Sequence, residues 1–223
     1  MQLVVGLGNP GRRYRHNRHN IGFRCLEALA RELGFAFAEE TPQYRLAGGD
    51  GRGGPVTLLE PLTYMNRSGD AVLAWARRSG FSVGQAAEEA GIEESSMVAP
   101  EVVPIVVCDD LNLPLGSIRI RARGRDGGQN GLASVIAAVG GEGLPRLRLG
   151  VGPLAETVPP EVWADYVLHD FDPSESEAAA ELVQRGAAAL SDLLILGPAA
   201  AASRHNRRIR VDIRVDEDLP DNG

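Results

Sequence analysis

The side chains in this sequence that could carry out chemistry are a histidine, an aspartate and three asparagines in polar segments beside apolar ones. A histidine with a carboxylate partner is the usual general-base pair, because the carboxylate fixes the tautomer and stabilises the imidazolium. Asparagine is costly to bury unless its amide is fully hydrogen-bonded, so several asparagines at strand ends suit recognition of amide or ester groups. The chain has no GxSxG nucleophile motif, and direct attack by water fits best. The residues concerned are His19, Asp109, Asn9, Asn66 and Asn130.

The first of these polar segments follows the start of the chain. Leu3, Val4 and Val5 form a short apolar run that predicts a buried strand, and three glycines with Pro10 then end it. Four arginines, two histidines, two further asparagines and a tyrosine follow within residues 11–20. Polar side chains that leave the end of an interior strand lie where α/β folds place their clefts. Segment 3–20 is therefore predicted to be part of a functional site.

Strands and helices are predicted to alternate along the rest of the chain, which is typical of one α/β domain. Polar loops are predicted at 9–20, 64–68, 109–113 and 124–131, and an acidic, partly helical excursion at 82–104. The predicted helices cover 21–33 (with Gly34 as C-cap), 68–78, 132–139, a short one within 159–168, 175–194 and 199–208. The predicted strands cover 3–5, 43–47, 55–59, 105–107, 117–123, 146–152 and 209–215.

Length and composition are those of an ordinary globular chain. Its 223 residues suit one well-buried domain better than two, and we see neither repeats nor a domain linker. No uninterrupted apolar run approaches the ~20 residues that span a bilayer, and no signal pattern precedes the first strand, so a cytoplasmic protein without a membrane partner is expected. Cys25 and Cys108 are expected to be buried free thiols, with a disulfide as the alternative.

The charge is segregated along the chain. The net charge of −7 taken alone argues against a nucleic-acid partner. However, all 23 basic residues are arginines, six of them within 1–31 and six within 117–148. Segments 82–104 and 154–181 carry five and eight acidic residues and no basic one. Such segregation predicts one basic face on an acidic protein; solvated helix faces in an arginine-rich proteome are the alternative.

Five motifs, in this order, resemble those of the bacterial-type peptidyl-tRNA hydrolases. They are GLGNPGRRYRHNRHNIGF, PLTYMNRSG, VVCDDLNLPLG, GGQNGL and RLRLGVGP. The resemblance runs from Leu3 to about Asn206, is poor in 82–104 and absent after Ile209. It implies a single α/β/α domain, here residues 1–208, with a twisted mixed sheet, an acidic insertion at 82–104 and an extension at 209–223. It also implies a monomer without metal or cofactor that hydrolyses the ester between a peptide and the 3′ ribose of tRNA.

The resemblance also implies roles for individual residues. His19 would be the base that activates water, and Asp109 would hold it. Asn9 would recognise an acylated amino group, while Asn66 and Asn130 would hold the peptide backbone, the water or the developing oxyanion. The channel for the tRNA end would be lined by Tyr14 and Tyr64, with Met65 packed in the wall of the site. The 5′ phosphate of tRNA would be held by a clamp made of Arg121 and Arg148.

Each assignment has an alternative. His19 could be a surface histidine, and His16 with His19 could be a metal site, although no acidic or cysteine partner stands nearby. Asn66 could cap the helix that follows, in competition with Ser68. Tyr64 and Met65 could be ordinary cleft wall, and Asp110 a solvated neighbour of Asp109. The arginines at 119, 121, 123 and 125, which would share one face of a strand, could form a solvated face rather than contact phosphate.

Two positions depart from the family pattern. Gln129 stands where the family usually has histidine, and Asn112 where aspartate is usual.

Two other functions are alternatives to peptidyl-tRNA hydrolysis. A dinucleotide-binding oxidoreductase is suggested by the glycines at 6, 8 and 11, but a loop rather than a helix is predicted after Gly11, and no acidic residue follows at the expected distance. A non-catalytic RNA-binding relative is disfavoured by the intact His19, Asp109 and Asn9.

Overall fold

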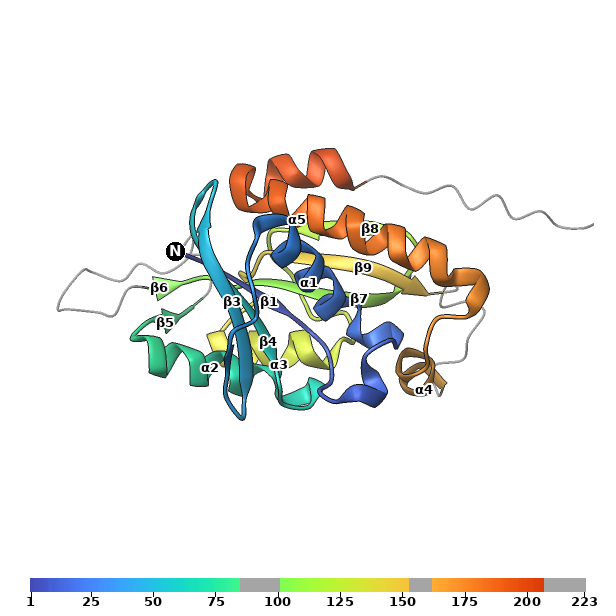
Figure 1. Ribbon diagram of the computed structural model, residues 1–223, viewed down its shortest axis with the longest axis horizontal. Helices are drawn as coiled ribbons and strands as arrows, with labels where there is room; N and C mark the ends of the chain where they lie inside the picture. Colours follow the sequence, from blue (N-terminus) through green and yellow to red (C-terminus); the bar gives the residue numbers. More distant parts are fainter. Residues whose placement is uncertain (85–100, 153–161, 207–223) are drawn as a thin grey trace, which may run out of the picture.

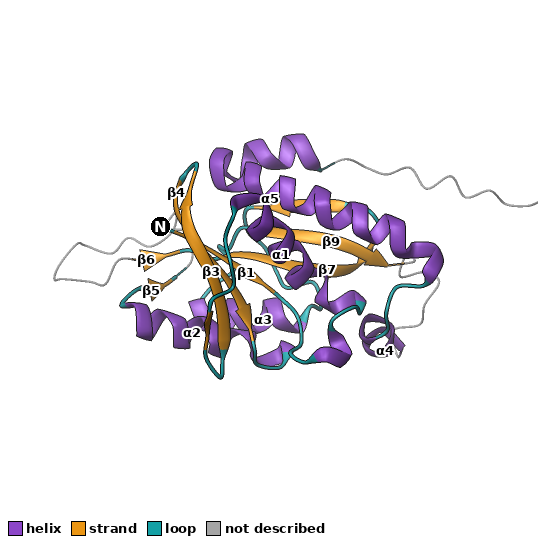
Figure 2. Cartoon of the chain, in the orientation of Figure 1, coloured by secondary structure: helices purple, strands orange, loops and turns teal. Residues whose placement is uncertain are grey.

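The computed structural model describes residues 1–84, 101–152 and 162–206. In these residues a twisted seven-stranded sheet lies between two layers of helices (Figures 1 and 2). The order is β2-β3-β4-β1-β7-β9-β8, with β1, β4, β7 and β9 parallel and β3 and β8 antiparallel to their neighbours. The strands are β1 (Gln2–Gly6), β2 (Glu39–Glu40), β3 (Tyr44–Gly51), β4 (Gly54–Pro61), β7 (Ile105–Pro114), β8 (Ile118–Arg121) and β9 (Arg146–Gly152). The predicted three-layer α/β fold is confirmed.

The helices divide between the two faces of the sheet (Figure 1). α1 (Ile21–Leu33) and α5 (Ser176–His205) cover one face, and α2 (Ser68–Ser79) and α3 (Asn130–Val139) cover the other. α4 (Trp163–Leu168) lies beyond the sheet edge where β1 and β7 end. A separate parallel pair consists of β5 (Ser82–Val83) and β6 (Glu101–Val102). Short 3₁₀ turns complete the list: η1 (Arg12–Tyr14), η2 (Arg18–Asn20), η3 (Met65–Arg67) and η5 (Pro173–Glu175).

The central strand β1 divides the core in two. Its side chains alternate, so that Val4 packs with α1 and α5 while Leu3 and Val5 pack with α2 and α3. All three are fully buried, as expected of a strand covered on both faces. Everything after Gly6 therefore leaves the middle of the sheet, which is where the first predicted functional segment begins.

Gly22, in the first turn of α1, lets this helix approach the sheet closely. A Cβ at Gly22 would lie 2.5 Å from the carbonyl oxygen of Leu7 and 2.7 Å from that of Val107. Since both contacts are with backbone, a side chain at Gly22 would push α1 away from β1 and β7. The close approach fixes the start of α1, and with it His19 three residues earlier, beside the ends of these two strands.

Two predicted boundaries were wrong. The polar segment 109–113 is not a loop, because β7 continues through it to Pro114 with a register irregularity after Asp110. The carboxylates of Asp109 and Asp110 tolerate burial in a strand because both have partners, described below. β8 ends at Arg121, so of the four arginines predicted to share one strand face only Arg119 and Arg121 do so.

α5 contains the predicted break between two helices. Gly197 has non-helical backbone angles (φ 79°, ψ 171°) and Pro198 follows it, so the helix kinks there. By length and composition alone, one described helical span, Pro173–His205, could cross a membrane, with a mean hydropathy of 1.4 over its best window. Part of this apolarity is explained by packing, since Leu182, Leu190 and Leu193 are buried in the core with α1. The predicted strand 209–215 and most of the predicted excursion 82–104 lie outside the described residues.

Both cysteines are free and buried, as predicted. They belong to different core clusters on opposite faces of the sheet. Burial raises the pKa of the Cys25 thiol, and burial followed by the nearby Asp109 charge raises that of Cys108 to about 12. Both thiols are therefore protonated at neutral pH and serve as core side chains.

Candidate active site

A cavity of about 390 Å³ lies at the sheet edge where the parallel strands β1, β7 and β9 end. Of the residues predicted from the sequence, five line it: Asn9, His19, Asp109, Asn130 and Arg148. They come from the segment after β1, from η2, from β7, from the start of α3 and from β9. The carboxyl edge of a parallel sheet is the usual position of a ligand site in α/β folds. The remaining lining residues are Asp110, Leu111, Asn112, Gly127, Gly128, Gln129 and, from α4, Trp163, Ala164, Val167 and Leu168.

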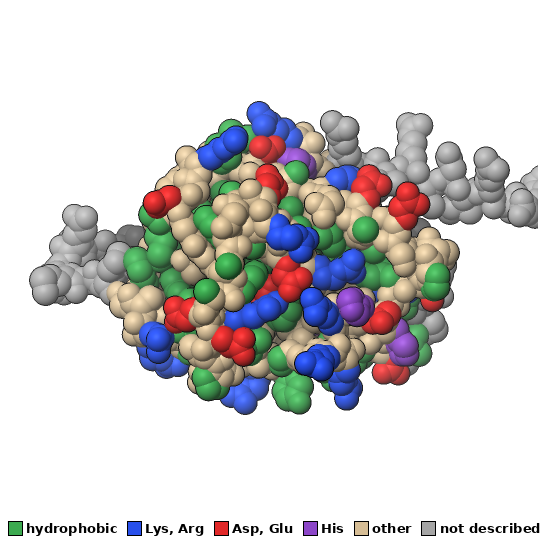
Figure 3. Space-filling model, viewed as in Figure 1, with side chains coloured by type: hydrophobic (Ala, Val, Ile, Leu, Met, Phe, Trp, Pro, Cys, Tyr) green, Lys and Arg blue, Asp and Glu red, His purple; other side chains and the backbone are tan. Residues whose placement is uncertain are grey.

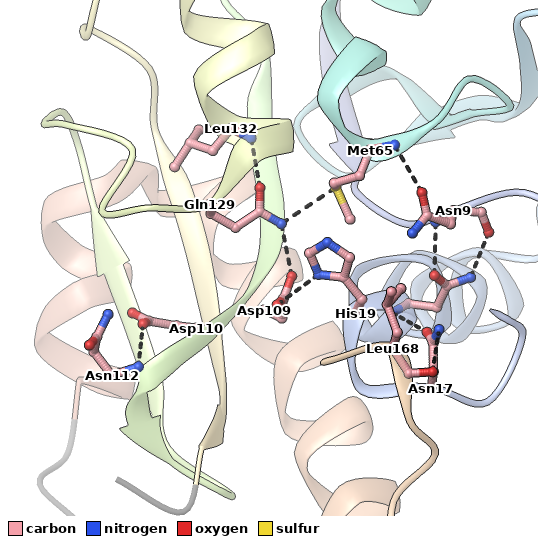
Figure 4. A network of polar contacts seen from close by, with 11 residues as sticks. Asn9, Asn17, His19, Met65, Asp109, Asp110, Asn112, Gln129, Leu132 and Leu168 are labelled. Atoms are coloured by element: carbon pink, nitrogen blue, oxygen red, sulfur yellow. Dashed lines mark hydrogen bonds and ion pairs between the residues drawn. The ribbon is translucent and has the colours of Figure 1, made fainter. Parts of the chain in front are cut away.

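His19 and Asp109 form the predicted pair. Nδ1 of His19 lies 2.9 Å from Oδ2 of Asp109 (Figure 4). A carboxylate accepts a hydrogen bond from Nδ1. Nδ1 therefore carries the proton, and the lone pair of Nε2 is left for chemistry. The other oxygen of Asp109, Oδ1, accepts from Nε2 of Gln129 at 2.8 Å. Each oxygen of this buried carboxylate thus has its own donor.

The pKa of His19 is shifted upward by this environment. Burial of the ring lowers the pKa, whereas the negative charge of Asp109 and the hydrogen bond to it raise it. The two effects of Asp109 together exceed that of burial, so the pKa of His19 lies above its ordinary value of 6.5. A base with a pKa near neutrality is well suited to proton transfer at physiological pH.

Gln129 fixes Asp109 and starts a helix at the same time. Its carbonyl oxygen accepts from the backbone N–H of Leu132 at 2.8 Å, as an N-cap of α3. This bond orients the carboxamide, so that its nitrogen points to Asp109 and also lies 3.5 Å from the sulfur of Met65. The Gln129 carboxamide carries no charge, so it holds Asp109 in the same way at every pH near neutrality.

Hydrogen bonds hold both the backbone and the carboxamide of Asn9. The side chain of Asn20 accepts from the backbone N–H of Asn9 at 2.8 Å and donates to its carbonyl at 2.9 Å. The side-chain oxygen of Asn9 accepts from the backbone N–H of Met65 at 2.9 Å (Figure 4). Because the oxygen is used in this way, the nitrogen of the carboxamide is the group left for a ligand. Asn9 is therefore a fixed hydrogen-bond donor at one end of the cavity.

Asp110 is not a solvated neighbour of Asp109, contrary to one reading of the sequence. It is buried, and its carboxylate lies 3.1 Å from Nε of Arg148 and accepts from the backbone N–H of Asn112 at 2.9 Å. Arg148 also donates to the carbonyl of Asp126 at 3.1 Å. The guanidinium of Arg148 is thus held at the cavity by contacts within the chain.

Five predicted residues do not line the cavity. Met65 is buried directly behind Asn9 and Gln129. Asn66 is exposed in η3 and does not cap α2, and the Ser68 hydroxyl instead donates to the carbonyl of Met65. Tyr64 is 65% exposed, Tyr14 is half-buried beneath Arg13, and Arg121 is exposed on β8. Their assigned roles remain predictions.

The sequence predicted that the two basic windows, 1–31 and 117–148, form one face. In the structure they do not converge on one face. Ile118 and Ile120 pack with α1 and α5, so by alternation Arg119 and Arg121 point to the opposite face of the sheet. Arginines of the first window instead surround hollows beside α1, where basic and acidic side chains mix (Figure 3). Of the arginines in the two windows, Arg148 lines the cavity. Most of the acidic segment 82–104, and residues 153–161, lie outside the described residues.

The geometry bears on two alternatives that the sequence left open. Gly11 leads into the 3₁₀ turn η1 and α1 begins only at Ile21, so the glycines at 6, 8 and 11 do not open a helix as a dinucleotide fingerprint requires. His16 is exposed and lines hollows outside the cavity. In the three described stretches, no three His, Cys, Asp or Glu side chains are grouped so as to hold a metal ion.

Comparison with known proteins identifies the family. The family model described as peptidyl-tRNA hydrolase matches residues 3–85 and 77–212, which together are most of the chain. The chain belongs to the peptidyl-tRNA hydrolase family. The peptidyl-tRNA hydrolase of Chloroflexus aggregans is 39% identical over 208 residues, covering 92% of this chain and 99% of the relative. That of Chlorobium phaeobacteroides is 37% identical, covering 93% and 99%.

Solved structures of the family have the same fold. The crystal structure of peptidyl-tRNA hydrolase from Acinetobacter baumannii superposes with a TM-score of 0.74 at 30% identity, covering 92% of this chain and 94% of that one. The crystal structure of a peptidyl-tRNA hydrolase in complex with N-propanol gives a TM-score of 0.75 at 29% identity, covering 95% and 97%. The resemblance read from the five motifs is therefore confirmed over the whole catalytic fold.

Sequence reasoning missed several residues of the site in this hydrolase. Asn20 and Gln129 orient Asn9 and Asp109, and Asn20 had been noted only as a member of the polar segment. The apolar wall from α4 was not predicted at all. No periodic or charged signal marks such a wall in a six-residue helix, whose position depends on contacts distant in sequence.

Proposed function

We propose that His19 acts as general base and activates a water molecule for attack on the ester of peptidyl-tRNA. This chain is an ester hydrolase that cleaves peptidyl-tRNA and releases tRNA for reuse, as a member of its family. The observation that carries the mechanism is the 2.9 Å contact between His19 Nδ1 and Asp109, which leaves Nε2 as the base. The test is turnover of N-acetyl-aminoacyl-tRNA by single-residue variants, set out in the Discussion.

In the proposed reaction, Nε2 of His19 takes a proton from water as the water oxygen attacks the ester carbonyl. The imidazolium that forms is stabilised by Asp109, and the tetrahedral intermediate carries an oxyanion. When the intermediate collapses, the bond to the ribose oxygen breaks and the imidazolium returns its proton to that oxygen. The products are the peptide carboxylate and tRNA with a free 3′ hydroxyl. We assign to Asn130, at the cavity edge, and to Asn66 the stabilisation of the oxyanion or the peptide backbone.

Asn9 gives the enzyme its selectivity in this proposal. Its carboxamide nitrogen donates to the carbonyl of the group that acylates the substrate's amino nitrogen. A free α-ammonium is itself only a donor and would leave the Asn9 nitrogen without an acceptor. An unpaired polar group of this kind costs about 1–3 kcal/mol. Ordinary aminoacyl-tRNA should therefore be spared.

Two substitutions test the role of Asn9. Asn9→Ala is expected to narrow the preference for N-acetyl-aminoacyl-tRNA over aminoacyl-tRNA by about 10- to 100-fold, because the discriminating donor is lost. Asn9→Asp presents an acceptor to the substrate and should raise relative activity on the free amine further. The measurement is kcat/KM on both substrates with each variant. Wild-type enzyme that cleaves the two at equal rates would refute the assignment.

The 5′ phosphate of tRNA is proposed to bind at Arg121 and Arg148, since a guanidinium can bind two phosphate oxygens at once. Arg121 is exposed, whereas Arg148 also holds the buried Asp110, so Arg121→Ala is the cleaner substitution. Each lost phosphate contact should reduce the slope of log affinity against log salt by about 0.7–0.9. The control pair is Arg185→Ala with Arg204→Ala on α5, which should keep the wild-type slope. A wild-type slope in the Arg121→Ala, Arg148→Ala double variant would place the clamp elsewhere.

Three further properties belong to this proposal. The catalytic domain comprises residues 1–208, with 82–104 an acidic insertion and 209–223 an extension. The enzyme acts as a cytoplasmic monomer, with no membrane partner. It uses no metal or other cofactor. The hydrogen bonds around His19, Asp109 and Asn9 support the monomer, because each of these groups is oriented by contacts within one chain.

A further inference from the structure

The residue before the proposed base, Arg18, is a buried charge. Only 3% of its surface is exposed. Burial of an arginine is unfavourable unless the guanidinium is paired and hydrogen-bonded, so a position of this kind needs an explanation. Arg18 does not line the cavity, and the reaction described above does not use it.

The contacts of Arg18 lead to α4 and to the segment that follows it. Its guanidinium donates to the carbonyl of Asp170 at 2.6 Å, is paired with Glu175 at 2.5 Å, and stacks 4.2 Å from the ring centre of Tyr166. The same guanidinium lies 5.2 Å from the ring centre of Phe171. The backbone repeats the connection, since the N–H of Arg18 donates to the carbonyl of His169 at 3.1 Å. One buried cation thus holds the end of α4 and the start of η5.

α4 is the element that supplies the apolar wall of the cavity. Trp163, Ala164, Val167 and Leu168 line it together with residues of β7 and β9. Tyr166, on the same helix, stacks on Arg18 and donates its hydroxyl to the carbonyl of Val151. The position of the wall relative to His19 therefore depends on the contacts of Arg18.

His19 itself is fixed by other contacts. The side chain of Asn17 accepts from the backbone N–H of Asn20 at 3.1 Å, and Asn20 is bound to Asn9. His19 is bound to Asp109, which Gln129 holds from the far side. Loss of the Arg18 guanidinium would loosen α4, whose remaining hydrogen bonds include those of Asn17 to Leu168 and of Tyr166 to Val151, while the base and its partner keep their places.

We propose that Arg18 is a positioning residue for substrate specificity, which holds α4 as an apolar wall against the side chain of the esterified amino acid. The proposal rests on the proposed function, because it takes the cavity to be the site of the peptidyl ester. It assigns to the wall a preference for apolar side chains at that residue. An apolar contact of this size is worth about 10- to 200-fold in kcat/KM.

The test compares two substrates, N-acetyl-phenylalanyl-tRNA and N-acetyl-glycyl-tRNA, with Arg18→Gln. KM for the phenylalanyl substrate is expected to rise at least tenfold, while KM for the glycyl substrate and the inflection of the pH–rate profile stay at wild-type values. Arg18→Lys keeps the positive charge but not the planar guanidinium, so its KM for the phenylalanyl substrate should lie between those of wild type and Arg18→Gln. The control is Arg204→Gln, which removes a surface ion pair with Asp192 on α5 and should change neither substrate.

A structural role without specificity would lower activity on both substrates alike, and that result would overturn the proposal, as would an unchanged ratio of the two KM values. Should Arg18→Gln not fold, Glu175→Ala removes the partner at a quarter-exposed position and must shift the same ratio in the same direction. The wild-type enzyme distinguishes failure of the proposed function from failure of the role of Arg18. If wild type cleaves neither substrate, the proposed function is refuted, whereas the role of Arg18 is judged from the ratio of KM values in an active wild type.

Discussion

His19→Ala is expected to lower turnover of N-acetyl-aminoacyl-tRNA by about 10²- to 10⁴-fold, the usual contribution of a positioned general base. The imidazole brings a basic nitrogen to the cavity, whereas both oxygens of Asp109 accept hydrogen bonds and Asp110 is paired with Arg148 and accepts from the backbone N–H of Asn112. Without it, water would have to attack without a base. The measurement is kcat under saturating substrate, together with tRNA affinity, which should stay near the wild-type value.

His16→Ala is the matched control for this variant. His16 lies in the same segment, three residues before the base, and is exposed outside the cavity. It should leave turnover unchanged. Full activity of His19→Ala would exclude the proposed mechanism, and an equal loss in both histidine variants would attribute the effect to the segment rather than to the base.

Asp109→Asn is expected to reduce turnover by a comparable factor of about 10²- to 10⁴-fold, for a reason specific to this site. The carboxylate accepts from His19 with one oxygen and from Gln129 with the other. Asparagine has a single carbonyl oxygen, so its NH₂ must face one of the two donors. If it faces His19, it stabilises the tautomer that is protonated on Nε2, which is not a base.

The same variant should bind tRNA with nearly wild-type affinity, because Asp109 is buried and makes no contact that a phosphate would need. A companion substitution, Gln129→Ala in the Asp109→Asn background, removes the competing donor and should restore part of the activity. If Asp109→Asn turns over at the wild-type rate, His19 does not depend on this carboxylate.

The sequence allowed the sheet edge to be predicted, because apolar strands followed by glycines and polar residues mark such edges, and the family resemblance allowed the contact between His19 and Asp109 to be predicted. It did not allow the end of β7 to be predicted. Asp109 and Asp110 look like part of a loop when read locally, and only partners distant in sequence, at His19, Gln129 and Arg148, make them acceptable in a buried strand. Local polarity cannot report such pairing.

The direction in which Asn9 points was likewise beyond the sequence. Its segment marked it as a recognition residue, but its backbone is held by Asn20, eleven residues later, and whether its carboxamide donates or accepts depends on Met65, fifty-six residues later. For the arginines, the sequence suggested more free positive charge than the structure leaves exposed. Arg146 is buried, with its guanidinium bound to carbonyls that include Gly124 and Glu142, and Arg18 holds α4. A count of basic residues therefore overstates the charge that is free for RNA.

The most direct test of the central claim is the pH dependence of kcat/KM for N-acetyl-aminoacyl-tRNA in wild type and in Asp109→Asn. The neutral form of His19 is the active one, so activity should rise with pH through the pKa of the free enzyme's histidine. In wild type the inflection should lie above 6.5, because Asp109 raises that pKa more than burial lowers it. In Asp109→Asn only burial remains, and the inflection should move to lower pH as the rate falls. An inflection that stays at the same pH in both proteins would contradict the pairing of His19 with Asp109 as the catalytic base.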